Sequence, residues 1–542
     1  MKNSRGWRTG VRAVATAIVA LLVLSGCGGQ TVAGAGVGGN GGQHLVIGIE
    51  SDVTAFDPQG LGSGWVSTRI NQQIFDRLVT EDLSVPSEDA AQSPLVGGLA
   101  EDWKISEDGT VYTFHLREGV TFHDGTDFDA EAVEFNIRRM WDQDFEYYDT
   151  AAGGQNLYIW QYLEDLEVTG DHEIVLTLSQ PFSEFLSMIA QGPTYLMSPA
   201  SVEQYGQDIG EHPVGTGAFV FEDHVRGERV DLVRNDDYWG EPAKLDGVTF
   251  RPIPDASSRT SALRNDEVDM IAVPHPDSIK GLLDDGYKLS SGQPPHVWFF
   301  VFNQEDEALG NLKVRQAISH AIDREGLADD LLQGTAIPAT DVQPRSSGLP
   351  VTERDEYRYD PELAKRLLAE AGYEDGLSFT LMTSVDGSGQ MIPAPMAEYI
   401  QQNLEAVGIH AEIETMEWVS YLNRYTGGIG DAGMMQMSWG LASPFWIYRM
   451  LHSSQIAPNG MNVGGYANDD LDEVMEAAES SLDEDEAEEY WLEAHDIVAK
   501  DMAYLPIVHD TAPYILAPRV EGFVSPSQQW YDLSTVSLNV GD

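Results

Sequence analysis

The order of elements between residues 377 and 413 constrains the fold more than any other feature of the sequence. Residues 377–382 are typical of a strand, a helical pattern follows that stops at Gly408, and residues 409–413 are again typical of a strand. Strands joined by a helix in this way run parallel in one sheet, which predicts an α/β lobe. The apolar positions of the helix are Ile400, Leu404 and Val407.

The helix expected before this unit has clear start and stop signals. Asp360 can cap its first turn, Pro361 suits the first helical position, and Gly372 can end the helix in the left-handed conformation. Its expected buried stripe is Leu363, Leu367 and Ala371. Further strands are expected over 45–49, 111–116, 173–178, 218–222, 229–234 and 505–508, and further helices over 129–141, 313–322 and, as a charged pair, 469–500.

Length and composition indicate a globular protein with more than one core. The 542 residues amount to about three to four domain equivalents, and cores stop growing near about 250–300 residues, so one undivided core is not expected. Hydrophobic residues make up 42% and charged residues 22%, close to ordinary globular usage, which argues against a disordered or fibrous chain.

The charge of the chain is strongly unbalanced. Lys and Arg number 31 against 88 Asp and Glu, a net charge of -57. Such a chain repels phosphate backbones, so a nucleic-acid partner is not expected. Two interpretations of the acidity stay open. One is a strongly solvated surface, which we favour, and the other is adaptation to high salt, where screening weakens self-repulsion.

A basic segment, an apolar run and a lone cysteine mark the amino terminus. Four basic residues precede the apolar run 13–24, which is too short to span a bilayer but suits the core of a signal peptide over 1–26. Leu24-Ser-Gly-Cys27 resembles a bacterial lipobox, in which Cys27 would carry the lipid; the alternative is a buried free cysteine in an uncleaved helix. The Gly-rich residues 27–43 are expected to form a flexible tether, and no later stretch is apolar enough for a transmembrane helix.

Several specific motifs stand in order along most of the remaining chain. They are Leu99-Ala-Glu-Asp-Trp103, Leu116-Arg-Glu-Gly-Val-Thr-Phe-His-Asp-Gly125, His212-Pro-Val-Gly-Thr-Gly217, Arg234-Asn-Asp-Asp-Tyr-Trp-Gly240, Leu312-Lys-Val-Arg-Gln-Ala-Ile318 and Tyr359-Asp-Pro-Glu-Leu-Ala364. Together they resemble the extracellular solute-binding proteins of family 5, the peptide/nickel-type receptors of bacterial ABC importers. Most of these residues are typical of turns and packing, so the resemblance bears more directly on the fold than on the ligand.

The resemblance implies an α/β, two-lobed fold like that of periplasmic binding proteins of type 2, in the large variety with three subdomains, mixed sheets and a hinge. Lobe 1 would contain 44–296 and 509–542, with an inserted subdomain near 70–190. Lobe 2 would contain 297–508. The ligand would lie in the cleft, and the lobes would close over it.

The resemblance also implies a receptor rather than an enzyme. It would capture an oligopeptide or a similar organic solute and deliver it to ABC permease subunits with a cytoplasmic ATPase. It would act as a monomer without cofactor or metal, on the extracytoplasmic face of the membrane and held there by the lipid on Cys27. An oligosaccharide or other non-peptide solute, a nickel complex and a chemosensory role stay open.

A secreted hydrolase is the alternative from a different class. With 88 acidic residues, two carboxylates at a suitable distance prove nothing. The sequence contains no GxSxG elbow, no HExxH motif and no P-loop. Residues 428–433 spell GxGxxG, but between a helix and a strand in the wrong order for a dinucleotide site. The 13 histidines form no i, i+4 pair, so no metal site is expected.

One candidate ligand-binding segment is 57–65, which resembles the first cleft loop of the family. Its glycines let backbone approach a ligand closely, and Trp65 offers a flat face for stacking. The alternative is a mobile surface loop. The candidate ligand-binding residues of this segment are Leu61, Gly62, Ser63 and Trp65.

Aromatic residues of the second lobe are the other candidates. Trp418 opens a short helix that runs to Tyr425, and Trp439 ends the apolar strand 434–439 before Gly440; by the resemblance, both tryptophans match pocket-lining positions. Trp298 lies in a strand that would cross between the lobes. For all three tryptophans the alternative is a place in the core.

The sequence departs from the pattern of peptide-binding relatives after the second tryptophan. Those relatives carry an aspartate three residues on, which pairs with the free α-amino group of a peptide, whereas this chain has Ala442. A nearby arginine position is Gln436 here. A neutral site of this kind suits a blocked peptide, an oligosaccharide or another polar solute as well as a free peptide, because a buried unpaired charge is unfavourable.

Overall fold

The computed structural model describes residues 42–60, 62, 64–385, 389, 391–440 and 442–539. Residues Gln43–Asp542 form one compact unit. The predictions for Cys27, Leu61 and Ser63 lie outside the described residues.

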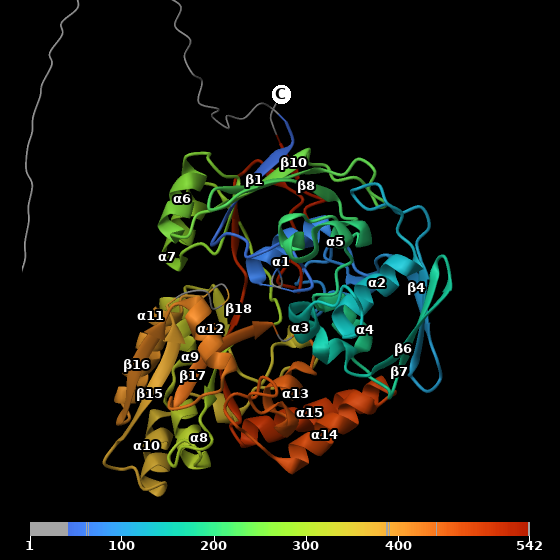
Figure 1. Ribbon diagram of the computed structural model, residues 1–542. Coiled ribbons are helices and arrows are strands. Elements are labelled where there is room, and N and C mark those ends of the chain that lie inside the picture. Colours follow the sequence, from blue (N-terminus) through green and yellow to red (C-terminus); the bar gives the residue numbers. More distant parts are fainter. Residues whose placement is uncertain are drawn as a thin grey trace, which may run out of the picture. The chain divides into compact units, whose positions relative to one another are not determined.

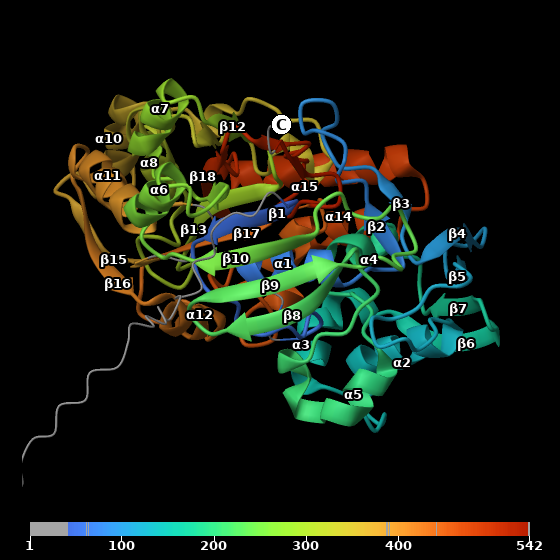
Figure 2. The same ribbon diagram turned by 90° about the horizontal axis from the view of Figure 1, so that it is seen from above.

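A seven-stranded mixed sheet is built from both ends of this unit (Figures 1 and 2). Its central strand β1 runs parallel to both of its neighbours, β10 and β11. Helices α1 (Trp65–Ile74), α6 (Ala256–Arg264) and α7 (Pro276–Asp284) contact strands of this sheet. In order across the sheet the strands are β12 (Lys288–Ser290), β19 (Tyr514–Leu516), β11 (Met270–Ala272), β1 (His44–Ile49), β10 (Gly247–Pro252), β9 (Arg229–Arg234) and β8 (Phe219–Val225).

A six-stranded sheet contains the predicted crossover. Strands β15 and β16 pair in parallel and are joined by α11 (Pro393–Glu405), which confirms the α/β prediction. In order the strands are β14 (Ala336–Pro338), β18 (Tyr504–Asp510), β13 (His296–Phe302), β17 (Met434–Gly440), β15 (Leu377–Ser384) and β16 (Ile409–Met416). The helices in this part of the chain include α8 (Leu312–Ala321), α9 (Arg324–Gly326), α10 (Pro361–Glu370) and α12 (Trp418–Thr426).

An antiparallel four-stranded sheet lies to one side in Figure 2. Helix α2 (Ala130–Trp141) packs on two of its strands and on α3 (Thr150–Trp160). Helix α2 corresponds to the helix predicted over 129–141; Asp129 caps it, and its side chain accepts a hydrogen bond from the Ala132 amide. The strands in order are β4 (Ala100–Ile105), β5 (Val111–Leu116), β7 (Glu173–Leu178) and β6 (Leu163–Gly170).

The described part of the chain also contains two small antiparallel strand pairs and five more α-helices. Two small antiparallel pairs are β2 (Val79–Glu81) with β3 (Leu95–Gly97) and β20 (Val520–Glu521) with β21 (Ser537–Leu538). The other helices are α4 (Phe185–Gln191), α5 (Pro199–Tyr205), α13 (Trp446–Leu451), α14 (Asp469–Ser480) and α15 (Glu484–Lys500).

Two hydrophobic cores hold the unit together. One lies with the seven-stranded sheet. The other joins the four-stranded sheet to the six-stranded one. In this second core, Phe182 of the chain around the four-stranded sheet contacts Phe445, which follows β17 of the six-stranded sheet; their ring centroids lie 5.2 Å apart. The four-stranded sheet therefore shares its packing with residues that come more than 250 positions later in the chain.

The predicted stripe of α10 is confirmed only in part. Leu367 and Ala371 pack against the core but are half-buried, as is Leu363, whereas Ala364 and Leu368 are each 2% exposed or less. Helix α10 packs against α8, and such contacts decide which side of a helix is fully covered. The helix start at Pro361 and the left-handed Gly372 are confirmed.

Within the described residues, no helix combines the length and the apolar character that crossing a membrane requires.

Candidate ligand-binding site

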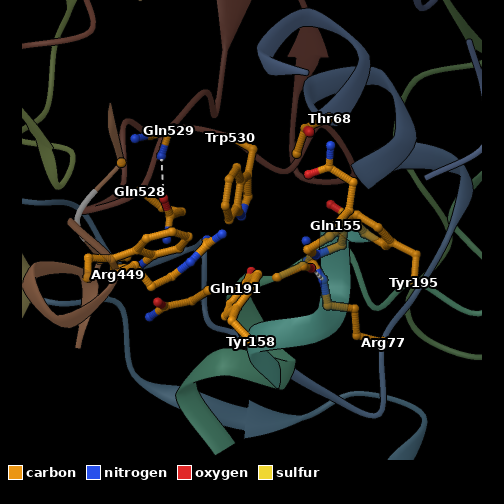
Figure 3. A pocket seen from close by; sticks show the side chains of 15 residues that line it. Thr68, Arg77, Gln155, Tyr158, Gln191, Tyr195, Arg449, Gln528, Gln529 and Trp530 are labelled. Carbon is orange, nitrogen blue, oxygen red and sulfur yellow. Dashed lines mark hydrogen bonds between the residues drawn. The ribbon is translucent and has the colours of Figure 1, made fainter. Parts of the chain in front are cut away.

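A cavity of about 210 Å³ is lined by residues from helices, from one strand end and from connecting segments (Figure 3). Its walls come from α1 and α3, from the turn after α4, from the end of β17 and helix α13, and from the segment 528–530. The lining residues are Thr68, Arg77, Gln155, Tyr158, Gln191, Gly192, Pro193, Tyr195, Gly440, Ala442, Trp446, Arg449, Gln528, Gln529 and Trp530. Aromatic faces with a few polar groups are the usual lining of a small-molecule site.

Arg449 extends into this cavity from α13 (Figure 3). Its guanidinium carbon lies 4.0 Å from the ring centroid of Tyr158 and 4.8 Å from that of Trp446. Among the described residues it takes part in no ion pair, and burial lowers its pKa. Arg449 is half-buried, so its guanidinium loses only part of its contact with water. Cation–π contacts of about 0.5–2 kcal/mol offset part of that loss.

Arg77 lies on the other side of the cavity in Figure 3 and is more fully bonded. Its Nε donates to the Gly192 carbonyl (3.0 Å) and its Nη1 to Gln72 Oε1 (3.1 Å). The guanidinium also lies 3.6 Å from the ring centroid of Tyr195. These contacts fix Arg77 as part of the wall.

Glu81 supports the polar wall from behind. Its carboxylate accepts hydrogen bonds from Gln528 Nε2 (2.9 Å) and Gln191 Nε2 (3.2 Å), two residues that line the cavity. Burial raises the pKa of Glu81 to about 7, although these hydrogen bonds and the charge of Arg77 act in the opposite direction. Glu81 thus fixes the orientation of both amides.

Three lining residues carry buried polar atoms without a hydrogen-bond partner. They are Gln191 Oε1, Trp446 Nε1 and Gln529 Nε2. Buried polar atoms are nearly always bonded in folded proteins, so an unpartnered one calls for an explanation such as a bound water or ligand. These three atoms are groups with which a polar ligand in the cavity could form hydrogen bonds.

Two of the predicted site residues, Gly440 and Ala442, line the cavity. A Cβ atom on Gly440 would lie 2.2 Å from Gln529 Nε2, so a larger residue there would displace that amide. Ala442 also contributes its carbonyl, which accepts a hydrogen bond from Gln92 Nε2 (3.0 Å).

The predicted aromatic residues form a row that leads to the cavity wall. Trp439 lies between Tyr425 and Trp446, with ring centroids 6.5 and 6.2 Å away. Tyr421 connects Tyr425 to Trp418, whose ring stacks on that of Tyr421 at 6.2 Å. Trp418 and Trp439 are half-buried, whereas Tyr425 is buried. The row reaches the cavity through Trp446, which was not among the predicted ligand-binding residues.

Gln436 and Trp298 lie in the core of the six-stranded sheet, each 0% exposed. Gln436 accepts a hydrogen bond from Thr383 Oγ1 (3.3 Å). Trp298 lies on β13 between two neighbouring strands and meets the ring of Phe300 edge-on at 5.1 Å. The structure does not bring either residue to the cavity lining.

The loop before α1 is held by its own contacts. Asp57, near its start, forms a buried ion pair with Arg139 (2.7 Å). A Cβ atom on Gly62 would lie 2.4 Å from the Asp57 carbonyl oxygen, so the glycine is required by the turn itself. Trp65 contacts the ring of His296 edge-on at 4.7 Å and is half-buried.

Most residues that line the cavity were not among the site residues predicted from the sequence. Arg449 and Trp446 are three residues apart on one short helix that follows directly on the predicted tryptophan motif, and this spacing could have drawn attention to them. Arg77, Gln191 and segment 528–530 come from distant parts of the chain and carried no such signal. Among the described residues, no group of three or more His, Cys, Asp or Glu could hold a metal ion.

Comparisons with known proteins agree with this fold. Residues 94–459 match the family described as bacterial extracellular solute-binding proteins, family 5 middle. Glutathione-binding protein GsiB of Salmonella paratyphi A is 31% identical over 491 residues, which are 89% of this chain and 92% of that protein. Heme-binding protein A of Haemophilus influenzae is 29% identical over 488 residues, which are 86% and 87% of the two chains.

A solved structure of the same kind is similar over nearly the whole chain. The ABC transporter-associated periplasmic binding protein DppA of Helicobacter pylori, in complex with the peptide STSA, has a TM-score of 0.80 and 28% identity, and the match covers 92% of this chain and 98% of that chain. The fold thus belongs to the class of substrate-binding proteins of ABC importers. The chain is a member of the bacterial extracellular solute-binding proteins, family 5. Proteins of this family bind peptides or small molecules outside the cytoplasm for delivery to ABC permeases.

Proposed function

We propose that this protein captures a small organic solute, an oligopeptide or a related compound, in the cavity of Figure 3 and releases it unchanged to a permease. The observation that carries this proposal is the cavity itself, whose aromatic and polar walls come from segments far apart in the chain, from Thr68 to Trp530. Its volume of about 210 Å³ lies below the about 300–1,000 Å³ of sites for drug-sized ligands, which favours a compact solute.

Mass spectrometry of the solute released from the purified, denatured protein tests this proposal. We expect one dominant small organic compound, and the same compound should bind the refolded protein in a one-to-one ratio. Glutathione and dipeptides are the first solutes to add, because similar proteins are described as binding them. Sustained product formation from peptides or glycosides would instead favour the hydrolase.

A non-peptide solute is the second candidate. It is supported by Ala442, which lines the cavity where peptide-binding relatives would place an aspartate, and by the absence of any Asp or Glu from the described lining. A released compound without a free amino group would favour this candidate.

We also propose that the unit works as two lobes, 44–296 with 509–542 and 297–508, with the four-stranded sheet in an inserted subdomain near 70–190. The proposal is supported by the strands: those of the seven-stranded sheet fall within 44–290 and 514–516. The connecting segments lie side by side, and the Gly292 amide donates to the Thr511 carbonyl (3.0 Å). Small-angle scattering should report a smaller radius of gyration with bound solute; identical profiles for a solute that binds would contradict closure.

The amino-terminal cysteine carries a separate proposal, that Cys27 is lipidated and holds a monomeric receptor on the outer face of the membrane. The supporting observation is the sequence pattern before Cys27. We expect Cys27→Ala to abolish labelling by a palmitate analogue and to release the protein from the membrane fraction. Labelling that persists in Cys27→Ala would contradict the proposal.

A further inference from the structure

We infer that the captured solute is an organic anion and that Arg449 binds its carboxylate. This inference rests on the proposed receptor function and names the class of solute. It concerns a residue that lines the cavity and extends into it (Figure 3).

The described lining of the cavity carries arginines but no carboxylate. The two arginines are Arg77 and Arg449. Arg77 is committed to the Gly192 carbonyl and to Gln72. Arg449 makes no hydrogen bond or ion pair with any described residue, so its five N–H donors are free to bind a ligand.

Two carboxyl groups, those of Glu81 and Glu184, are bonded to lining residues or to the neighbour of one. Glu81 is bonded to Gln528 and Gln191, and Glu184 accepts a hydrogen bond from Ser443 Oγ (2.8 Å). Burial raises the pKa of both groups, which favours their neutral forms. Neither group forms an ion pair with Arg449, so the positive charge of Arg449 remains to be balanced.

Two aromatic rings restrict the orientation of the Arg449 guanidinium. The rings of Tyr158 and Trp446 both contact the guanidinium of Arg449 and restrict its plane. A planar fork held in this way suits a carboxylate, which can accept two parallel hydrogen bonds. The unpartnered Trp446 Nε1 and Gln529 Nε2 are further donors around the same cavity. An acceptor-rich anion satisfies the guanidinium of Arg449, Trp446 Nε1 and Gln529 Nε2. An ammonium group finds no carboxylate in the described lining, and Gln191 Oε1 is the one unpartnered acceptor there.

The test uses two matched sets of compounds and isothermal titration calorimetry. One set is the dipeptide Met-Leu as the free acid, the N-acetyl acid, the amide and the N-acetyl amide; the other is glutathione with its N-acetyl and diester forms. We expect the acids to bind with or without a free amino group. The amides and the diester should bind at least about ten-fold more weakly, because they cannot pair with Arg449.

Variants connect this preference to the residue. Arg449→Gln should weaken binding of the acids about 10- to 100-fold and remove the difference between acid and amide. Arg449→Lys keeps the charge but not the planar fork, so we expect an intermediate affinity. The matched control is Arg366→Gln, because Arg366 is exposed on α10 and its loss should leave binding unchanged. Melting temperatures check that each variant is folded.

The outcomes separate this inference from the proposed function. Amides that bind as tightly as acids, or acids that bind Arg449→Gln as tightly as the unchanged protein, would overturn the anion inference and leave the receptor function standing. A neutral or cationic compound released from the purified protein would do the same. No binding by any compound of either set would count against both.

Discussion

At the scale of single residues, Trp439 is the predicted side chain whose role is most accessible to test. Its ring contacts Trp446, which lines the cavity, and it is half-buried. We expect Trp439→Ala to weaken binding of the released solute about ten-fold with an unchanged circular dichroism spectrum, because the ring of Trp439 packs against that of Trp446 and helps to hold this part of the cavity wall in place. Trp418→Ala should act in the same direction.

A matched control for these variants is Trp103→Ala. Trp103 is also half-buried but lies on β4, in the four-stranded sheet. It should leave the affinity unchanged. Unaltered affinity in both Trp439→Ala and Trp418→Ala would remove these residues from the ligand site.

Glu81 allows a prediction about pH at the same scale. Burial raises its pKa from 4.5 to about 7. Between these values the folded protein holds a proton that the unfolded chain has released, so the contribution of Glu81 to the free energy of unfolding falls as pH rises from about 4.5 to about 7. Glu81→Gln stays neutral and should raise the free energy of unfolding at pH 8 by about 1–3 kcal/mol, with little effect at pH 4.5.

Urea unfolding of the variant at both pH values measures this difference. Glu88→Gln is the control, because Glu88 is exposed and its substitution changes the net charge equally. A variant that is less stable than the unchanged protein at pH 8 would indicate that the ionised carboxylate is needed by Gln528 and Gln191.

At the scale of elements, the cap of α2 is a local feature with a local effect. Asp129 accepts a hydrogen bond from the Ala132 amide (2.9 Å), and α2 packs on α3, which contributes to the cavity wall. Asp129→Ala should lower the local stability of α2 by about 1 kcal/mol, seen as faster hydrogen exchange of its first turn. The control Asp127→Ala removes an exposed carboxylate two residues earlier. Equal exchange in the two variants would show that the cap contributes nothing.

At the scale of the whole molecule, the net charge of -57 predicts a dependence on salt. Self-repulsion of so many acidic groups destabilises the compact state, and the Debye length falls from about 30 Å at 0.01 M salt to about 3 Å at 1 M. We therefore expect a higher melting temperature at 1 M sodium chloride than at 0.01 M. Equal melting temperatures at both concentrations would count against adaptation to a saline environment.

Local sequence determined the elements and the family. The parallel pair β15 and β16, the cap of α2 and the start of α10 follow from periodicity, capping residues and turn glycines, which act within a few positions of one another. The buried stripe on α10 was predicted only in part: Leu367 and Ala371 pack against the core, but the fully buried residues are Ala364 and Leu368, because contact with other elements decides which side of an amphipathic helix is covered.

The ligand site was decided largely by tertiary structure. The sequence by itself led to Gly440 and Ala442, since a motif of consecutive residues marks that strand end. It could not bring Arg77, Tyr158 and Trp530 to the same cavity, because they are 81 and 372 residues apart in the sequence and meet only in the folded chain. The sequence also could not distinguish Arg449 from the arginines that have a carboxylate partner. Arg449 has none among the described residues. Whether a charge is balanced depends on distances in space, which the order of residues does not give.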